Sequence, residues 1–315
     1  MKPFNHTNAT SLAEVKTALA DGKTTLIAGG TDLLGTLKDN ILPTYPLTVI
    51  NLKTVPDLDF IREKGGMLII GATTRLADIA ADPIIQKKYT ALAQAASRVA
   101  TPHVREMGTI GGNISQLHRC WYFRKPENRF NCIRKGGRTC FAMTGDNRYH
   151  SIFGAVKGCI AVNISDTAPA LIALNARVIT DRRAIEAENF FDVQKPGNTV
   201  LAMDEIVKEI QIPGPSKGAK SAFMKFAFRK SIDFPIVNCA VMIGGKNPRI
   251  CLNAVAPKPY RATKAEAAIK GKRINERNAE AAGEAAVADA RPLKAAKFKV
   301  QIAKTLVKRS ILALA

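Results

Sequence analysis

Ile27-Ala-Gly-Gly-Thr-Asp-Leu-Leu-Gly35 is the stretch from which the fold of this 315-residue chain can be inferred. It continues a β-rich run, Thr25-Leu-Ile-Ala28, so the sequence predicts a strand that enters a tight turn at the glycines. Glycine permits positive φ and the close approach of another group, so successive backbone N–H groups can converge on a phosphate here. Thr31 adds a hydroxyl. The stretch therefore predicts a turn at a strand end that suits a phosphate-bearing ligand.

A second glycine turn, Gly108-Thr-Ile-Gly-Gly-Asn113, offers the same chemistry. Two such turns could hold both phosphates of a dinucleotide, although a Gly-Gly pair taken alone also fits a plain turn. The Rossmann pattern G-x-G-x-x-G and the nucleoside-triphosphate loop G-x-x-x-x-G-K-[ST] are both absent from the sequence. Any dinucleotide is therefore bound in another way.

The composition is that of an ordinary globular protein apart from its charge. Hydrophobic residues make up 46% and charged residues 23%, but 47 Lys and Arg face 26 Asp and Glu, a net charge of +21. At roughly 150 residues per domain, the length predicts two domains. No apolar run approaches the ~18 residues that cross a bilayer, and a signal-peptide pattern is missing, so we expect a cytoplasmic protein without a membrane span. Export as the passenger of a signal-bearing partner subunit is the alternative.

A basic chain with several cysteines also matches a nucleic-acid-binding zinc protein. Such proteins interleave basic residues with stacking aromatic residues on one surface. Only the segment Trp121-Tyr-Phe-Arg124 approaches that pattern. We therefore expect no nucleic-acid partner.

The first half of the chain alternates short helices and strands. Ser11-Leu-Ala-Glu14 fits a capping box that opens a helix. Periodicity predicts strands at Thr48–Leu52 and Met67–Ile70 and one long helix from about Pro83 to Val99. Helical periodicity resumes at Ser165-Asp-Thr-Ala-Pro-Ala-Leu171, after about fifty residues rich in Cys, Arg, Gly and Asn that look inserted.

The second half reads as successive strands followed by helices. One antiparallel sheet is predicted from the strands Glu205–Ile212, Ala222–Arg229, Ile236–Ile243 and Arg249–Val255. A capping box, Thr263-Lys-Ala-Glu266, and a final helix follow; the predicted apolar side of that helix carries Phe298, Ile302, Leu306 and Ile311. This order predicts an α+β fold with a first domain at 1–213 and a second at 214–315.

Four of the six cysteines fall within the inserted stretch, at the spacing C-x11-C-x7-C-x18-C: Cys120, Cys132, Cys140 and Cys159. Four thiolates suit zinc or an iron–sulfur cluster, and the absence of paired C-x2-4-C knuckles favours the cluster. From residue 118 to 160, nine Lys or Arg face two acidic residues, and cations stabilise an anionic cluster. Four unrelated thiols remain an alternative from the residues alone.

The other chemistry-bearing side chains near these cysteines are expected to be ordinary. His118 and His150 could replace a cysteine as ligands, but we expect them at the surface. Cys239 and Cys251 sit within apolar strands and are expected to be small core residues.

Five motifs in register resemble the FAD-binding medium subunit of the xanthine oxidase family of molybdenum enzymes. The resemblance runs from the N-terminus to about Ala268, and the final helix looks similar too. The motifs are Ile27-Ala-Gly-Gly-Thr-Asp-Leu-Leu34, Thr109-Ile-Gly-Gly-Asn113, Asp166-Thr-Ala-Pro-Ala-Leu171, Asp204-Glu-Ile-Val-Lys-Glu-Ile-Gln-Ile-Pro213 and Val255-Ala-Pro-Lys-Pro-Tyr-Arg-Ala262. The fold implied is a two-part FAD-binding domain of the CO dehydrogenase flavoprotein type, followed by a smaller α+β domain with an antiparallel sheet.

Most members of that family pass directly from the Gly-Gly-Asn turn to the Asp-x-Ala-Pro helix, whereas this chain inserts a loop at about 114–164. The FAD subunits of 4-hydroxybenzoyl-CoA reductase and of a bacterial molybdenum aldehyde oxidoreductase carry a similar loop, which binds a [4Fe-4S] cluster. His118-Arg-Cys-Trp-Tyr-Phe123, Gly137-Arg-Thr-Cys140 and Gly158-Cys-Ile-Ala161 resemble the aldehyde enzyme more closely. The resemblance implies that the four cysteines of the loop ligate the cluster.

The same resemblance implies a set of FAD contacts. The pyrophosphate would lie against residues 28–35 and against the second glycine turn. Asp166 would lie near the phosphate and ribitol, Val207 near the adenine or ring pocket, and Lys225 would be a basic contact from the second domain. A helix N-cap and a solvated strand lysine are the alternatives for Asp166 and Lys225. The complete candidate set is Ile27, Ala28, Gly29, Gly30, Thr31, Asp32, Leu33, Leu34, Gly35, Val99, Thr109, Gly111, Gly112, Asn113, Asp166, Val207 and Lys225.

The function implied is that of an electron-transfer subunit within a heterotrimer. A large subunit with the molybdenum cofactor would transform an aldehyde, an aromatic compound or an N-heterocycle, so this chain would have no catalytic residue for the organic substrate. A small [2Fe-2S] subunit would connect that centre to FAD, and the [4Fe-4S] cluster would extend the path toward an acidic carrier such as ferredoxin. The alternative is the beta subunit of 4-hydroxybenzoyl-CoA reductase, in which electrons enter from ferredoxin.

Overall fold

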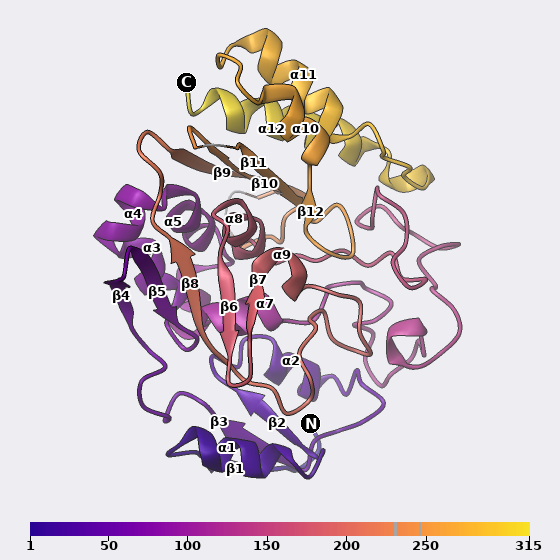
Figure 1. The fold of residues 1–315 in the computed structure, drawn as a ribbon. Helices are drawn as coiled ribbons and strands as arrows, with labels where there is room; N and C mark the ends of the chain where they lie inside the picture. The colour runs from indigo at the N-terminus through magenta and orange to yellow at the C-terminus, as the bar shows by residue number, and fades with distance from the viewer. Residues whose placement is uncertain (230–231, 246) are drawn as a thin grey trace.

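The computed structural model describes residues 1–229, 232–245 and 247–315 and arranges them in three tiers (Figure 1). The first tier is a parallel sheet of order β1-β3-β2 with two helices. Its elements are β1 (Asn5–Asn8), α1 (Leu12–Leu19), β2 (Thr24–Ile27), α2 (Leu33–Lys38) and β3 (Thr48–Asn51). Ser11 caps α1 as predicted, because its hydroxyl accepts a hydrogen bond from the Glu14 amide.

The middle tier combines an antiparallel sheet of order β4-β5-β8-β6-β7 with a layer of short helices. The strands are β4 (Ile61–Lys64), β5 (Met67–Gly71), β6 (Arg177–Thr180), β7 (Ala184–Glu186) and β8 (Val207–Pro213). The helices are α3 (Leu76–Ala81), α4 (Pro83–Lys88), α5 (Thr90–Ser97), α6 (Pro102–Met107), α7 (Ile110–Ser115), α8 (Thr167–Ala173) and α9 (Ala187–Phe190). The largest hydrophobic core lies between this sheet and the helices.

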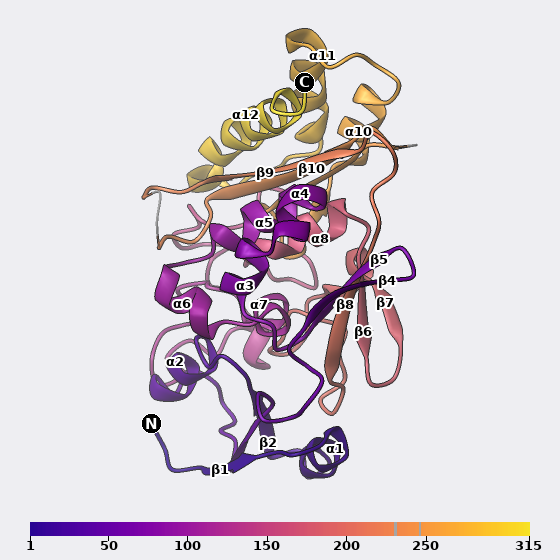
Figure 2. The same cartoon turned by 90° about the vertical axis from the view of Figure 1, so that its left-hand side faces the viewer.

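The third tier is an antiparallel sheet of order β12-β11-β10-β9 covered on both faces (Figure 2). Helices α10 and α12 pack on one face and are themselves covered by α11, while α5 and α8 of the middle tier pack on the other face. The elements are β9 (Lys220–Phe226), β10 (Val237–Ile243), β11 (Arg249–Asn253), β12 (Tyr260–Arg261), α10 (Thr263–Ile269), α11 (Glu276–Ala286) and α12 (Phe298–Leu312). Together the tiers confirm the predicted fold class, a mixed α and β structure that ends in an antiparallel sheet.

The inserted stretch runs between α7 and α8 along one side of the molecule (Figure 1). It has little regular structure, with one 3-10 helix, η1, at Ile133–Lys135. The other short 3-10 helix, η2 (Lys294–Ala296), precedes α12. None of the helices in the described ranges is long and apolar enough to cross a membrane.

Three sequence predictions of elements are wrong. The helix expected from Pro83 to Val99 is two helices, because Tyr89 adopts φ −127° and ψ 46° and buries its ring in the core. The strand expected at Glu205–Ile212 is β8, which pairs with β5 and β6 and belongs to the middle sheet. The capping box at Thr263 does not form, since the Glu266 carboxylate instead accepts from the amide of Ile250.

The buried side of the final helix, α12, also differs from the predicted apolar side. Leu306 and Ile311 are buried as expected, but Phe298 is 42% exposed. The buried side of α12 includes Lys299, which takes part in the contacts described below.

Candidate functional site

A cavity of about 540 Å³ opens where the three tiers meet, with walls from β2, α7, β8 and β9. It is lined by every residue of the candidate flavin set except Leu34 and Gly35. Those two residues lie in α2, just beyond the glycine turn. The structure thus brings together residues that are as much as 198 positions apart in the sequence, from Ile27 to Lys225.

Both glycine turns are tightly packed where they border the cavity. A Cβ at Gly29 would stand 2.1 Å from the carbonyl oxygen of Met107, and Gly30 has φ +69°. A Cβ at Gly111 would lie 2.8 Å from the Ala72 oxygen. Side chains are excluded at these positions, so the backbone itself forms this part of the wall.

The second glycine turn is the first turn of a helix. Thr109 is the N-cap of α7, and its Oγ1 accepts a hydrogen bond from the Gly112 amide at 3.2 Å. Asn113 lies one residue further into the same helix and is buried. Its Oδ1 accepts hydrogen bonds from Ser165 Oγ at 2.6 Å and Thr167 Oγ1 at 2.7 Å. One amide therefore joins the helix that precedes the inserted stretch to the helix that follows it.

A buried ion pair occupies the wall formed by α8 and β9. Lys225 Nζ lies 2.7 Å from Asp166 Oδ2, and both side chains are 4% exposed. Asn238 Nδ2 donates to Asp166 Oδ1 at 2.7 Å, and Lys225 also donates to the Arg98 carbonyl oxygen. Burial raises the pKa of Asp166, an effect that the Lys225 ammonium opposes. Lys225 is thus no solvated strand lysine, and Asp166 makes no side-chain cap to α8.

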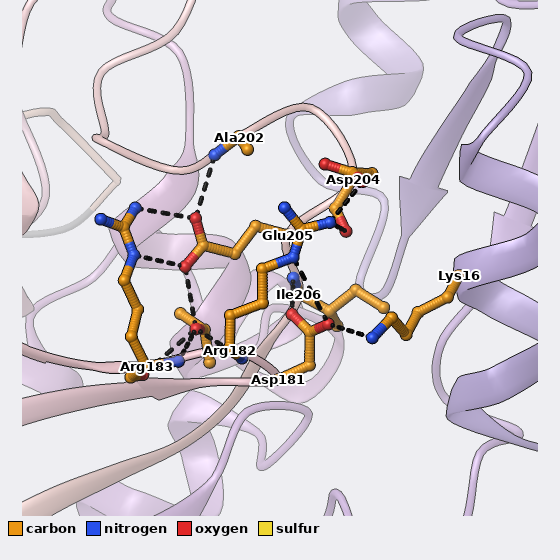
Figure 3. Close-up of polar contacts among 9 residues, drawn as sticks. Lys16, Asp181, Arg182, Arg183, Ala202, Asp204, Glu205 and Ile206 are labelled. Atoms are coloured by element: carbon orange, nitrogen blue, oxygen red, sulfur yellow. Dashed lines mark hydrogen bonds and ion pairs between the residues drawn. The ribbon is translucent and has the colours of Figure 1, made fainter.

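A carboxylate network fixes the wall beside β8 (Figure 3). Glu205 lines the cavity, and its oxygens accept from Arg183 Nε and Nη2, both at 2.8 Å, and from the Ala202 amide at 3.1 Å. These hydrogen bonds lower the pKa of Glu205 to about 2. Nearby, Asp181 pairs with Lys16 of α1 at 3.0 Å and accepts from the Ile206 amide. The network therefore ties the middle sheet to the first tier.

Several lining residues carry no recognisable sequence signal. Arg119 and Phe234 approach the cavity from the inserted stretch and from the segment between β9 and β10, with the guanidinium 4.7 Å from the ring centroid. Burial lowers the pKa of Arg119 to about 10, against the favourable charge of Asp32. The basic character of the insertion was the only hint available in the sequence.

The four cysteines of the insertion are free thiols that pack near one another. Cys120 packs against two small buried clusters, one that contains Cys132 and one that contains Cys159. The neighbouring Cys159 thiol lowers the pKa of Cys140 to about 6, the Cys140 thiol raises the pKa of Cys159, and burial raises the pKa of Cys120 to about 11. In the part of the chain that the structure describes, no three His, Cys, Asp or Glu side chains stand where they could hold a metal ion.

Two buried cations accompany these thiols. Arg134 is 2% exposed, and its Nη1 lies 3.8 Å from Cys159 Sγ. Its Nη2 donates to the Pro196 oxygen at 3.2 Å and also to the Gly197 oxygen and Asn198 Oδ1. Lys135 is 7% exposed, and its Nζ lies 5.1 Å from the centroid of the Phe123 ring. Burial lowers the pKa of Arg134, an effect that the Cys159 and Cys132 thiols and the Asp192 carboxylate oppose. Within residues 1–229, 232–245 and 247–315, Lys135 Nζ has no hydrogen-bond acceptor.

The prediction of surface histidines is wrong, since His118 and His150 are 1% and 2% exposed. His118 packs on Phe123, with ring centroids 4.1 Å apart. His150 Nε2 lies 3.2 Å from Cys120 Sγ. Burial lowers the pKa of both rings, that of His150 to about 4. Cys239 and Cys251 are fully buried strand residues, as predicted.

Comparison with protein families matches two models in succession. Residues 2–215 match the FAD binding domain in molybdopterin dehydrogenase, and residues 221–314 match the CO dehydrogenase flavoprotein C-terminal domain. Among curated proteins, the aldehyde oxidoreductase FAD-binding subunit PaoB of Escherichia coli (strain K12) is 32% identical over 96% of each chain. The carbon monoxide dehydrogenase medium chain of Hydrogenophaga pseudoflava is 29% identical over 84% of this chain and 81% of its own.

Solved structures share the fold along the whole chain. A carbon monoxide dehydrogenase from Hydrogenophaga pseudoflava, which lacks the Mo-pyranopterin moiety of the molybdenum cofactor, matches with a TM-score of 0.77 and 28% identity, covering 100% of this chain and 98% of that one. The quinoline 2-oxidoreductase of Pseudomonas putida 86 matches with a TM-score of 0.75 and 24% identity, over 100% of this chain and 98% of that one, and supports the fold alone.

Proposed function

We propose a function from one premise: the chain belongs to the FAD-binding medium subunits of the xanthine oxidase family of molybdenum hydroxylases. It is accordingly an FAD-binding oxidoreductase subunit of a multi-subunit molybdenum enzyme. Within that enzyme, we assign it the relay of electrons between the molybdenum and [2Fe-2S] subunits and an external carrier. We place the domain boundary after Pro213, where β8 ends.

The cavity suits the FAD that this function requires. Its glycine walls leave backbone where a diphosphate must approach closely, and the Thr109 cap sits at the start of α7. We propose that the residues around Gly30 and Gly112 hold the pyrophosphate. The buried ion pair of Asp166 and Lys225 would then face the phosphate and ribitol, and Val207 the adenine or ring pocket.

The inserted stretch suits a [4Fe-4S] cluster, and the observation that carries this step is the pair of buried cations. Burying a guanidinium and an ammonium without a carboxylate is costly unless an anion accompanies them. Arg134 lies against Cys159, and Lys135 is close enough to Cys132 and Cys120 to feel their charge. Four cysteine thiolates around a cluster supply that anion. We propose Cys120, Cys132, Cys140 and Cys159 as its ligands.

Flavin chemistry joins a two-electron exchange to one-electron centres, which is what FAD supplies when bound. The chain's own residues then have structural tasks. The glycine turns hold the diphosphate, the Lys225 ammonium opposes the rise that burial causes in the pKa of Asp166, and the Glu205 network holds the wall beside β8 in place. We propose that the organic substrate, for which an aldehyde is favoured by the 32% identity to PaoB, is transformed in the molybdenum subunit.

The external carrier would be an acidic protein such as a ferredoxin. Residues 118–160 carry nine Lys or Arg, of which Arg134 and Lys135 are buried, so seven remain against Glu127 and Asp146. A basic surface accelerates encounter with an acidic partner. Raising the ionic strength should therefore slow electron exchange with such a carrier, because salt screens charges beyond about 8–10 Å.

Metal and flavin analysis of Cys140→Ala tests the assignment. The purified protein should release FAD on denaturation, and Cys140→Ala should lose about four irons while still binding FAD when FAD is supplied in excess. Cys251→Ala, which alters a buried thiol of β11 outside the insertion, is the matched control and should keep both. Protein that carries zinc and no flavin would contradict the proposal.

A further inference from the structure

Asp32 belongs to the first glycine turn, yet its carboxylate points to the inserted stretch. Oδ1 lies 2.9 Å from Arg119 Nη2 and 2.8 Å from Arg124 Nη2. Oδ2 accepts a hydrogen bond from the Leu117 amide at 2.9 Å. The side chain is 19% exposed, so solvent screens these interactions only in part. Three contacts thus join one carboxylate to a segment that begins 85 residues away.

Arg124 extends this connection to the first cysteine of the insertion. Its guanidinium also donates to the backbone oxygens of His118 at 2.9 Å and Leu117 at 3.0 Å. Its own amide donates to the Cys120 oxygen at 2.9 Å. The position of Cys120 is therefore fixed, through Arg124, relative to Asp32.

A second set of contacts with the inserted stretch lies at the end of α2. The Glu127 amide donates to the Asp39 oxygen at 2.9 Å, and the Asn128 amide to the Asn40 oxygen at 3.1 Å. These backbone bonds hold the chain beyond α2 against the insertion. The glycine turn and the cysteine-bearing segment consequently behave as one packed unit.

The same unit forms part of the cavity wall. Asp32, Leu117 and Arg119 all line the cavity, and Arg119 also stacks on Phe234. A ligand that orders the glycine turn therefore orders the segment that carries Cys120, and an occupied cysteine site orders the turn in return. Two sites that stabilise the same arrangement of one element are coupled, and the coupling is reciprocal.

We propose that Asp32 is a positioning residue that couples the two cofactor sites, so that each cofactor binds more tightly when the other is in place. This inference rests on the FAD and iron–sulfur sites proposed above. The resemblance offered Asp32 as a contact to FAD; the geometry assigns its carboxylate to Arg119, Arg124 and the Leu117 amide.

A double-mutant cycle on the full-length chain tests the coupling. The FAD dissociation constant is measured by fluorescence titration of flavin-depleted protein in four forms: wild type, Cys140→Ala, Asp32→Asn and the double variant. Loss of the cluster in Cys140→Ala should weaken FAD binding about tenfold, within the 5–150-fold range of site-to-site coupling. In the Asp32→Asn background, the same loss should change the constant less than about twofold.

Asp39→Asn is the matched control, since it removes one exposed carboxylate that follows α2 and should leave the tenfold ratio unchanged. Arg124→Lys is a second variant, which keeps the charge but cannot reproduce the fork of contacts, and should lower the ratio. If Asp32→Asn does not fold, Arg124→Lys tests the coupling in its place. The coupling is wrong if Cys140→Ala leaves the FAD dissociation constant of the wild-type chain unchanged, or if it weakens FAD binding as much in Asp32→Asn as in wild type. Either result would leave the proposed function standing. Absence of flavin or iron from wild type would overturn the proposed function itself.

Discussion

Arg134 is the buried cation whose guanidinium lies beside Cys159, one of the proposed ligands of the cluster. Replacement by Gln removes a charge that would stabilise the reduced, more negative cluster, so the cluster's reduction potential should fall. A charge-assisted hydrogen bond worth about 1.5–3 kcal/mol corresponds to a shift of roughly 60–130 mV for one electron. Potentiometric titration followed by electron paramagnetic resonance would measure it. Arg134→Lys keeps the charge and should shift the potential less; an unchanged potential in Arg134→Gln with an intact cluster would rule out this role.

The hydrogen-bonded carboxylate of Glu205 (Figure 3) makes a pH-dependent contribution to stability that can be tested. Its pKa of about 2 lies below the ordinary 4.5, so the stabilisation is complete above pH 4.5 and is lost as the pH falls toward 2. Glu205→Gln should lower the free energy of unfolding at pH 7 by about 1–3 kcal/mol, and the difference from wild type should shrink with acidification.

Urea denaturation at pH 7 and at pH 3 would measure the Glu205 effect. Asp204→Asn is the control, because it removes a neighbouring carboxylate that pairs with Arg182 at the surface, where its side chain is 46% exposed. A much smaller, salt-sensitive change is expected there. Equal effects of the two variants would contradict the importance of the buried network.

Single residues also show where the sequence was insufficient. The sequence offered no way to tell a solvated Lys225 from a buried one, because its partner Asp166 lies 59 positions away. For the same reason His118 and His150 were expected at the surface although tertiary packing buries both. The two glycine turns, in contrast, carry a local signal, whereas Asp166, Val207 and Lys225 were named from the family resemblance; the structure places both turns and these three residues on one cavity.

At the scale of the elements, Gly29 in the first glycine turn and Gly35 in α2 differ in whether there is room for a Cβ. A Cβ at Gly29 would meet the Met107 oxygen at 2.1 Å, so Gly29→Ala must push α6 away from the turn. We expect flavin affinity to fall at least tenfold, about 1.4 kcal/mol. Gly35 lies inside α2 with nothing within 4 Å of its Cβ position, so Gly35→Ala should keep the affinity and add up to about 1 kcal/mol of stability. Flavin titration and thermal unfolding of both variants test this contrast.

Element type was easier to predict than element pairing. Alternation predicted a strand near Val207, and β8 is one, but nothing local indicates that it pairs with β5 and β6 rather than with β9. Periodicity likewise predicted helix across Tyr89 and missed the break, since apolar spacing continues through it. Pairing and helix breaks depend on packing between distant segments, which a sequence pattern does not contain.

At the scale of the whole molecule, Lys299 links the third tier to the insertion. Its Nζ donates to the His150 oxygen at 2.9 Å and to the Ala254 oxygen, and burial lowers its pKa to about 7. The unfolded chain therefore binds more protons than the folded chain between pH 7 and about 10.5, so this group makes stability rise with pH there.

Lys299→Met should remove that rise, which amounts to at most about 1.4 kcal/mol per pH unit. The difference in unfolding free energy between wild type and variant at pH 7 and pH 9 isolates the effect from the other charges of the chain. Lys297→Met changes an exposed lysine two residues earlier and should leave the slope unaltered. If the unfolding free energy of Lys299→Met rises with pH as steeply as that of the wild type, Lys299 is charged in the folded protein.

The hydrogen bonds of Asn113 join the two ends of the inserted stretch, which bears on how a chain of this fold could gain or lose the proposed cluster. The Asn113 amide holds Ser165 and Thr167, so the polypeptide leaves the flavin domain and returns to it at nearly the same point. Since the excursion begins and ends together, a connection of a few residues could replace it, and the longer path costs little extra closure entropy. The insertion is thus a self-contained segment of the chain. Transfer of residues 116–163 into a relative that has a direct connection at this point should leave the relative's topology unaltered and carry the proposed cluster with it.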